Sequence, residues 1–250
     1  MDRESLLGPT EIFMMEFSRM ARGMASASES TWTDRSIQES ILKISHMERV
    51  GNHIIQSHLK MIIGLYIWKD GERYEGYWAE GKFHGKGIKT LPDGTIFDGD
   101  WEEGRPVGQG MCKYPDGAKY TGSWHNGQPH GVGVKVLPDG TKYTGDWIDG
   151  KANGRGVKTL LNGTTYDGEW DDGKFKKGLC TYPDGKLYEG EWVEGKPHGI
   201  GVKTWADGRK YDGVWDMGKP TGKGKKVYPD GRAKEGYWEN GAFIEGGKSI

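Results

Sequence analysis

From Tyr74 onward, aromatic residues and glycines alternate with polar residues along the chain. Tyr74, Gly76 and Trp78 occupy every second position, and the positions between them are mostly polar across the chain, as at Glu75. Side chains at every second position of a β-strand point to one face, so this alternation predicts strands with one half-buried face. A Pro-Asp-Gly triplet at 92–94 predicts a tight turn, because proline presets φ, aspartate bonds its own backbone and glycine accepts a positive φ.

This pattern recurs at a nearly constant period. Full copies begin at Tyr74, Phe97, Tyr120, Tyr143, Tyr166, Tyr188 and Tyr211, and a truncated copy begins at Lys234. Each step is 23 residues, except for the 22-residue step from Tyr166 to Tyr188. A second turn falls at Gly81 and its counterparts, so two strands and two turns fill each copy. The period therefore predicts one β-hairpin per copy, with no helices between the hairpins.

We expect a mainly β fold: an elongated, twisted, single antiparallel sheet of tandem β-hairpins, preceded by an N-terminal α-helical segment. The sheet domain is predicted over 61–250, and a helical arm with a linker over 1–60. With about 4.8 Å per strand, each hairpin adds roughly 10 Å to the sheet, and the right-handed twist of the strands is expected to coil it. Such a sheet has to hide one face, and the Tyr–Trp pairs supply apolar surface for that.

The first sixty residues follow a helical pattern instead. A short helix is predicted over 11–24 because Phe and Met recur on one face, and the small, polar residues 25–33 form a linker. The segment 36–39 fits a capping box, and the helix after it is expected to run to about residue 62 with one apolar stripe. Three interpretations stay open for this helix: docking on the protein's own sheet, a coiled-coil or partner-binding arm, and a membrane-surface helix. Our hypothesis is that it lies along the sheet near the sheet's N-terminal end.

The motif Tyr-x-Gly-x-Trp-x-x-Gly-x-x-His-Gly-x-Gly, present at 74–87 and 188–201, resembles the MORN repeat (membrane occupation and recognition nexus). The resemblance covers about 65–250, and it implies an elongated twisted sheet with an aromatic groove. It also implies a scaffold or adaptor role at membranes, cortical cytoskeleton or cilia, with a helix held along the groove in some relatives. Two departures stand out: Lys177 replaces the first glycine of His-Gly-x-Gly, which suggests a bend, and Lys234 replaces Tyr in the last copy, which suggests a polar cap.

The aromatic residues have two open interpretations. Most are expected to form a self-packed seam, and the rest to line a groove that binds a helical or extended segment of a partner protein. The candidate groove residues are Tyr74, Trp78, Phe97, Trp101, Tyr120, Trp124, Tyr143, Trp147, Tyr166, Trp170, Tyr188, Trp192, Tyr211 and Trp215.

Two columns of basic residues suggest an alternative role as a peripheral membrane tether. Lys89, Lys135, Lys158, Lys203 and Lys226 share one position of the copy, and Lys82, Arg105, Lys151, Lys174, Lys196 and Lys219 share another. Spaced by roughly 10 Å, the first column could face anionic phospholipids or an acidic helix. Against this, the charges over 61–250 balance, which is typical of a solvated surface. A regulatory fragment of a larger enzyme complex is a further alternative.

Composition changes this picture little. The 43 glycines and 11 tryptophans fit a folded repeat protein, and the net charge of −1 argues against nucleic-acid binding. No apolar run reaches transmembrane length and no secretory signal is visible, so we expect a cytoplasmic protein at the cytoskeleton, the cilium or the membrane periphery. The two cysteines, Cys112 and Cys180, share a column three copies apart, which predicts reduced thiols. Dimerisation through the terminal sheet edges is a further expectation.

No catalytic constellation is recognisable. The glycines near Lys225 miss the P-loop spacing. His84, His130 and His198 share one column with Asn153 and Thr221, so a polar turn role fits them better than a metal site. Residues repeated at fixed intervals do not converge on one pocket, so we expect no enzyme activity, no cofactor and no metal.

Overall fold

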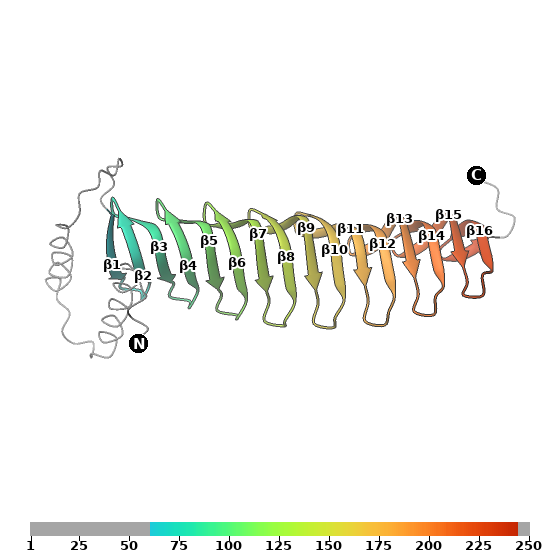
Figure 1. Ribbon diagram of the computed structural model, residues 1–250, viewed down its shortest axis with the longest axis horizontal. Coiled ribbons are helices and arrows are strands. Elements are labelled where there is room, and N and C mark those ends of the chain that lie inside the picture. The colour runs from blue at the N-terminus through green and yellow to red at the C-terminus, as the bar shows by residue number, and fades with distance from the viewer. Residues whose placement is uncertain (1–60, 245–250) are drawn as a thin grey trace, which may run out of the picture. The chain divides into compact units, whose positions relative to one another are not determined.

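The computed structural model describes residues 61–244, which fold as one antiparallel sheet of 17 strands (Figure 1). The described residues contain no helix. The helices predicted within 1–60 lie outside the described residues. The strands are β1 (Met61–Ile67), β2 (Arg73–Ala79), β3 (Lys82–Thr90), β4 (Ile96–Glu102), β5 (Arg105–Lys113), β6 (Lys119–His125), β7 (Gln128–Val136), β8 (Lys142–Ile148), β9 (Lys151–Thr159), β10 (Thr165–Asp171), β11 (Lys174–Thr181), β12 (Leu187–Val193), β13 (Lys196–Thr204), β14 (Lys210–Asp216), β15 (Lys219–Val227), β16 (Ala233–Glu239) and β17 (Ala242–Ile244).

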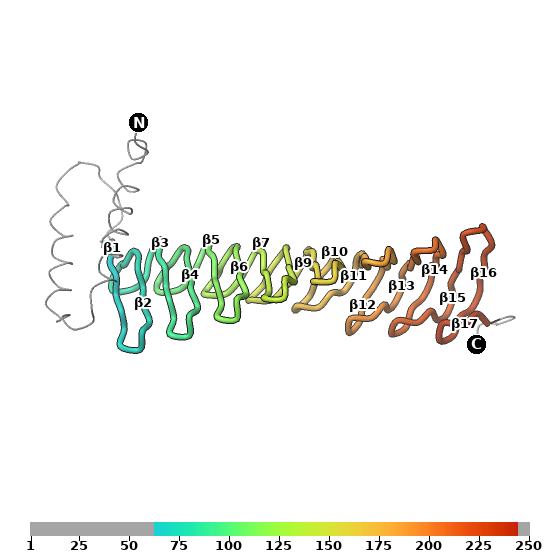
Figure 2. Tube along the Cα trace, turned by 90° about the horizontal axis from the view of Figure 1, so that it is seen from below, coloured from blue at the N-terminus to red at the C-terminus, as the bar shows by residue number. Residues whose placement is uncertain are grey.

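Each strand pairs only with its neighbours in the sequence. The pairing is antiparallel throughout, from β1 with β2 to β16 with β17. The hairpins therefore stand side by side in chain order, and their tilt changes along the row (Figure 2), as the right-handed twist of strands requires. The predicted single sheet of tandem hairpins is confirmed.

Two kinds of turn alternate along the sheet, both where the sequence predicts them. The two-residue turn between β2 and β3 has positive φ at both central residues, 50° at Glu80 and 76° at Gly81, which is the hairpin turn that matches strand twist. At the Pro-Asp-Gly turn, the Gly94 N–H donates to the Leu91 carbonyl at 2.9 Å. The Asp93 carboxylate accepts a hydrogen bond from the Thr95 N–H at 2.8 Å. The turn is thus stabilised by its own residues.

The His-Gly-x-Gly segment forms a two-residue bulge, which the sequence analysis did not predict. Gly76 of β2 pairs with Gly87, but the next residue, Tyr77, pairs with His84. The two residues between His84 and Gly87 face no residue of β2, although both pair with β4 on the other side. Gly85 has a φ of 58°, a conformation that glycine adopts without strain. This explains why a glycine follows the histidine.

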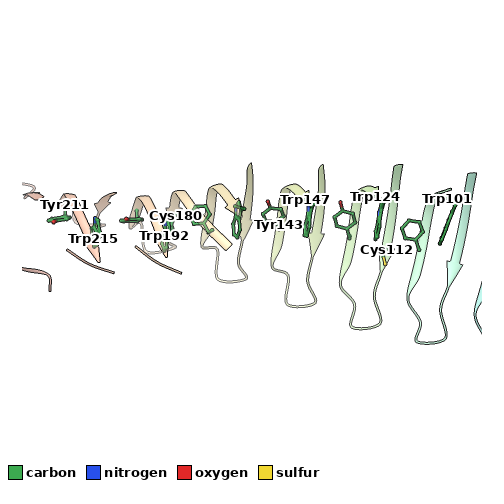
Figure 3. Packing of buried hydrophobic residues seen from close by; sticks show 14 of the residues in the cluster. Trp101, Cys112, Trp124, Tyr143, Trp147, Cys180, Trp192, Tyr211 and Trp215 are labelled. Carbon is green, nitrogen blue, oxygen red and sulfur yellow. The ribbon is translucent and has the colours of Figure 1, made fainter. Parts of the chain in front are cut away.

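The core is a row of aromatic rings along one face of the sheet (Figure 3). The Tyr120 ring lies over two facing glycines, and a Cβ placed on Gly133 would come within 2.2 Å of its hydroxyl oxygen. That hydroxyl donates to the Ser123 carbonyl at 2.9 Å. In seven of the eight copies, the tryptophan N–H donates to a glycine carbonyl 14 residues earlier, as from Trp147 to Gly133 at 3.1 Å. Each of these seven tryptophans thus bonds its own strand to the preceding one.

Candidate functional site: the aromatic face

The fourteen predicted groove residues form one continuous structure, here called the aromatic ladder. In six of the seven full copies, the ring at the first position contacts the tryptophan of its own copy and that of the next. The exception is Tyr166, which contacts Trp192 of the next copy and Phe175 of its own. The Tyr120 ring, for example, lies 5.1 Å from Trp124 and 5.2 Å from Trp147, edge to face in both cases. This geometry is favourable for aromatic pairs and contributes beyond simple burial. The ladder therefore joins neighbouring hairpins as well as covering them.

The ladder residues are mostly buried by one another. Twelve of the fourteen are buried, with Tyr188 at 0% and Trp215 at 2% exposure, and Trp78 and Tyr166 are partly buried. Burial raises the pKa of Tyr120, Tyr143 and Tyr211 to about 12, so their hydroxyls stay protonated donors at neutral pH. The ladder forms the apolar floor of this face, and few of its own rings are accessible to a ligand.

A second line of apolar residues lies beside the ladder, at the residue that precedes each Pro-Asp-Gly turn or its equivalent. We call it the turn-side row, and its members are Trp68, Leu91, Tyr114, Leu137, Leu160, Tyr182, Trp205 and Tyr228. Trp68, Tyr114, Tyr182 and Trp205 pack against the ladder. All eight keep part of their surface exposed, and Leu137 is 37% exposed. A pocket of about 380 Å³ opens in this row and is lined in part by Tyr114, Lys135 and Leu137.

The sequence analysis missed the turn-side row. The signal was available, because each copy has an aromatic residue or leucine directly before the turn. The Tyr-x-Gly-x-Trp alternation covers only the first strand of each copy, whereas the row residues follow the second strand. The row is the part of this face that offers accessible rings.

The first lysine column also lies on the aromatic face. The Lys135 Nζ is 5.5 Å from the Tyr114 ring centre, and the Lys203 Nζ is 5.4 Å from that of Trp205. Lys89 lies over Phe83 and Lys226 over Trp205, Tyr228 and Trp238, whereas Lys158 is partly buried. Such cation–π contacts hold the lysine stems flat on the rings. These lysines therefore add positive charge next to the turn-side row, and their side chains lie along the aromatic face instead of extending into solvent.

The second basic column lies at the two-residue turns. Lys82 pairs with Glu103 and Lys151 with Asp172, each across successive turns. These pairs are exposed to solvent, where an ion pair contributes little to stability. This column therefore lies in solvent along the two-residue turns, at the ends of the strands.

The column of the first lysines also contains Cys112 and Cys180. Both are free thiols, as predicted, and both are buried. Burial raises the pKa of each thiol, which lowers its reactivity. Within residues 61–244 no group of His, Cys, Asp and Glu side chains could hold a metal ion, and no helix there is suited to cross a membrane.

The short copy breaks the regular pattern. Trp192 is 3% exposed, yet its N–H has no acceptor among the described residues. The Tyr166 ring centre is 5.4 Å from that of Phe175. The Tyr120 hydroxyl donates to the backbone carbonyl three residues later, but the Tyr166 hydroxyl makes no such hydrogen bond. β11 pairs with β12 at five positions, one fewer than β13 with β14. The missing residue therefore weakens the junction after β11.

Comparisons with known proteins agree with this repeat architecture. The family model described as "MORN repeat" matches residues 74–96, 97–119, 120–142, 143–165, 166–186, 188–208 and 211–231. A search of curated proteins gave no significant match.

Solved structures resemble the chain only distantly. One is the TCP domain of SAS-4 (dCPAP) in complex with a proline-rich motif of Ana2 (dSTIL) of Drosophila melanogaster, with a TM-score of 0.38 and 11% identity over 76% of this chain and 97% of that chain. Another is virginiamycin B lyase from Staphylococcus aureus, with a TM-score of 0.16 and 11% identity over 71% of this chain and 73% of that chain. These low TM-scores support no functional argument. The seven matched repeats, in register with the hairpins and the aromatic ladder, show that this chain belongs to the MORN-repeat family.

Proposed function

We propose that this protein is a non-enzymatic scaffold that binds a helical or extended segment of another protein along its aromatic face. The observation that supports this most directly is the turn-side row, a line of partly exposed aromatic and leucine side chains that continues through every copy. Apolar surface arranged in a continuous line is typical of protein interaction sites. The ladder beside it is buried and closely packed, so a partner would meet a preformed surface.

The spacing of the row suits a segment that runs along the sheet. Each hairpin adds roughly 10 Å, and seven residues of an α-helix rise by about 10.5 Å. A helix laid across the hairpins would advance by one heptad per hairpin. One side chain of each heptad would then lie near one member of the row. An extended segment would do the same with about three residues per hairpin. The proposal therefore covers both kinds of partner segment.

The proposal is tested by capturing partners with the full chain and with the variant Tyr182→Ser/Trp205→Ser/Tyr228→Ser. A partner that binds the wild-type protein should be lost by this variant and then shown to bind directly when purified. The control variant Val132→Ser/Ile200→Ser changes two apolar residues outside the ladder and the row, which are 64% and 68% exposed. Equal capture by all three proteins would contradict the proposal.

Anionic lipid is the second candidate ligand, favoured by the first lysine column, four of whose five members lie over rings of the aromatic face. Flotation with vesicles that contain anionic lipid tests it. The assay is done at low salt, because salt screens the attraction between basic residues and anionic lipid. Vesicle binding that is lost in Lys135→Gln/Lys203→Gln/Lys226→Gln, with no protein partner found, would favour the tether.

A further inference from the structure

The residue directly after each turn glycine changes character along the sheet. It is Glu72 in the first described turn, a threonine or alanine at 95, 118, 141 and 164, and then Lys186, Arg209 and Arg232 in the last three turns. Three consecutive copies therefore add a cation at a position that is neutral or acidic in all the earlier ones. This change coincides with the short copy, after which β12 begins.

These cations lie next to the turn-side row. The Arg209 guanidinium is 5.5 Å from the Trp205 ring centre, and that of Arg232 is 5.8 Å from Tyr228. The Lys203 and Lys226 ammonium groups approach Trp205 from the ladder side, at 5.4 and 5.6 Å. Each of these two partly buried rings thus has at least two cations close to it.

The local carboxylates balance only part of this charge. Lys186, Arg209 and Arg232 each pair with the aspartate of their own turn, at 2.6 to 2.7 Å. Within the described part of the chain, Lys203 and Lys226 have no carboxylate within ion-pair distance. At the other end of the sheet, Lys89 is paired with Glu72 at 3.0 Å. The aromatic face is therefore positive over the last three copies and neutral to acidic over the first two.

We propose that the C-terminal third of the aromatic face is a binding site for an acidic polypeptide segment, and that it fixes the direction in which a partner lies along the sheet. The site consists of Lys186, Lys203, Arg209, Lys226 and Arg232 around Trp205 and Tyr228. It rests on the proposed function, which places a protein segment on this face. The partner's acidic part lies over β12–β16 and its neutral apolar part over β2–β5. Charge complementarity of this kind sets orientation more than affinity.

A polypeptide fits this site better than a phospholipid headgroup. The aspartates paired with three of the five cations oppose a phosphate group and a glutamate alike, so the arrangement of the site decides between the two ligands. The cations also follow a line along the sheet and border rings that can accept apolar side chains. A segment that alternates acidic and apolar residues satisfies both features.

The test uses two labelled synthetic peptides of about 21 residues, a helix length that matches the roughly 30 Å of three copies. Both carry leucine or phenylalanine on one face, and they differ only in having glutamate or glutamine at the flanking positions. Their affinity for the full chain is measured by fluorescence anisotropy at low and high salt. We expect the glutamate peptide to bind about tenfold more tightly at low salt and to lose this preference at high salt.

The matched variant is Lys186→Thr/Arg209→Thr/Arg232→Thr, because threonine occupies this position at 95, 141 and 164. It should fold normally by circular dichroism and bind both peptides within about twofold of each other. Equal binding of both peptides to the wild-type protein, or an unchanged preference in the variant, would overturn this inference alone. Absence of binding by either peptide would overturn it together with the proposed function. If anionic vesicles but neither peptide bound, and the variant lost them, the site would be a lipid site and the inference wrong.

Discussion

The facing glycines on paired strands are the residues on which the aromatic ladder depends. A Cβ on Gly133 would lie 2.2 Å from the Tyr120 hydroxyl oxygen, closer than any non-bonded contact allows. The tyrosine ring fills the space that two side chains would otherwise occupy, and it can do so only while both positions lack them. The repeated glycine is thus explained by packing and not by flexibility.

We predict that Gly133→Ala destabilises the sheet by about 1–3 kcal/mol, the usual cost of overpacking a core. Gly64→Ala is the control, because a Cβ there would have no neighbour closer than 3.6 Å. Urea denaturation followed by tryptophan fluorescence measures both variants. Similar midpoints for the two variants would show that the tyrosine is not packed as described.

The buried tyrosines predict an alkaline limit to stability. Burial raises the pKa of Tyr120, Tyr143 and Tyr211 to about 12, from an ordinary value of 10.0. A raised folded-state pKa means that the neutral form is favoured in the fold, so its stabilisation is complete below pH 10 and is lost as the pH rises towards 12. We expect the sheet to unfold in this window, as followed by circular dichroism. Replacing these three tyrosines with phenylalanine should move the transition to higher pH, and an unmoved transition would contradict the assignment.

At the scale of the element, the short copy shows what one residue contributes. Other copies have two extra residues in the bulge of the second strand, whereas β11 has one, between Phe175 and Lys177. The Trp192 N–H is then left without an acceptor, although Trp215 donates to the Gly201 carbonyl at 2.9 Å. An unsatisfied buried donor costs about 1–3 kcal/mol, and β11 pairs with β12 at fewer positions than the strands at any other junction between successive hairpins. The junction between β11 and β12 is therefore the weakest of these junctions.

Hydrogen exchange should reveal this junction. We predict that the Trp192 indole proton exchanges at least about fivefold faster than that of Trp215, the factor expected for a lost hydrogen bond of about 1 kcal/mol. Proton NMR of the indole signals, assigned by single Trp→Phe variants, provides the measurement. Exchange at equal rates would mean that the indole N–H has found another acceptor.

The period and the turns of the elements could be predicted from the sequence, because each is encoded within a few neighbouring residues, such as Pro92 to Gly94. The bulge could not, since the same residue count is filled by two plain strands and two turns. The sequence places the missing residue within 176–178, but its effect appears at Trp192. Linking the two requires the bond from each tryptophan to a glycine 14 residues earlier, which only the register of the hairpins reveals.

At the scale of the whole sheet, nearest-neighbour pairing makes stability a sum over hairpins and their junctions. The weak junction after β11 divides this sum into two blocks, β1–β11 and β12–β17. Strong coupling across every junction would give one transition, and a weak junction allows two.

We predict that urea unfolds the protein in two steps, and that inserting one glycine between Lys176 and Lys177 merges them by restoring the 23-residue period. Circular dichroism with tryptophan fluorescence at increasing urea would show this. Inserting a glycine at the exposed Gly94 turn instead is the control, and it should leave two steps. A single step in the natural protein would contradict the division into blocks.

Because each hairpin pairs only with the hairpins before and after it, the length of the sheet is set by the number of hairpins. Gaining or losing one 23-residue unit shifts the reach of the protein by a fixed increment and leaves the remaining contacts as they were. Length can therefore be adjusted by duplication without redesigning a core. The single 22-residue unit is the exception to this regular spacing. A duplication on either side of it would lengthen one block and leave the length of the other unchanged.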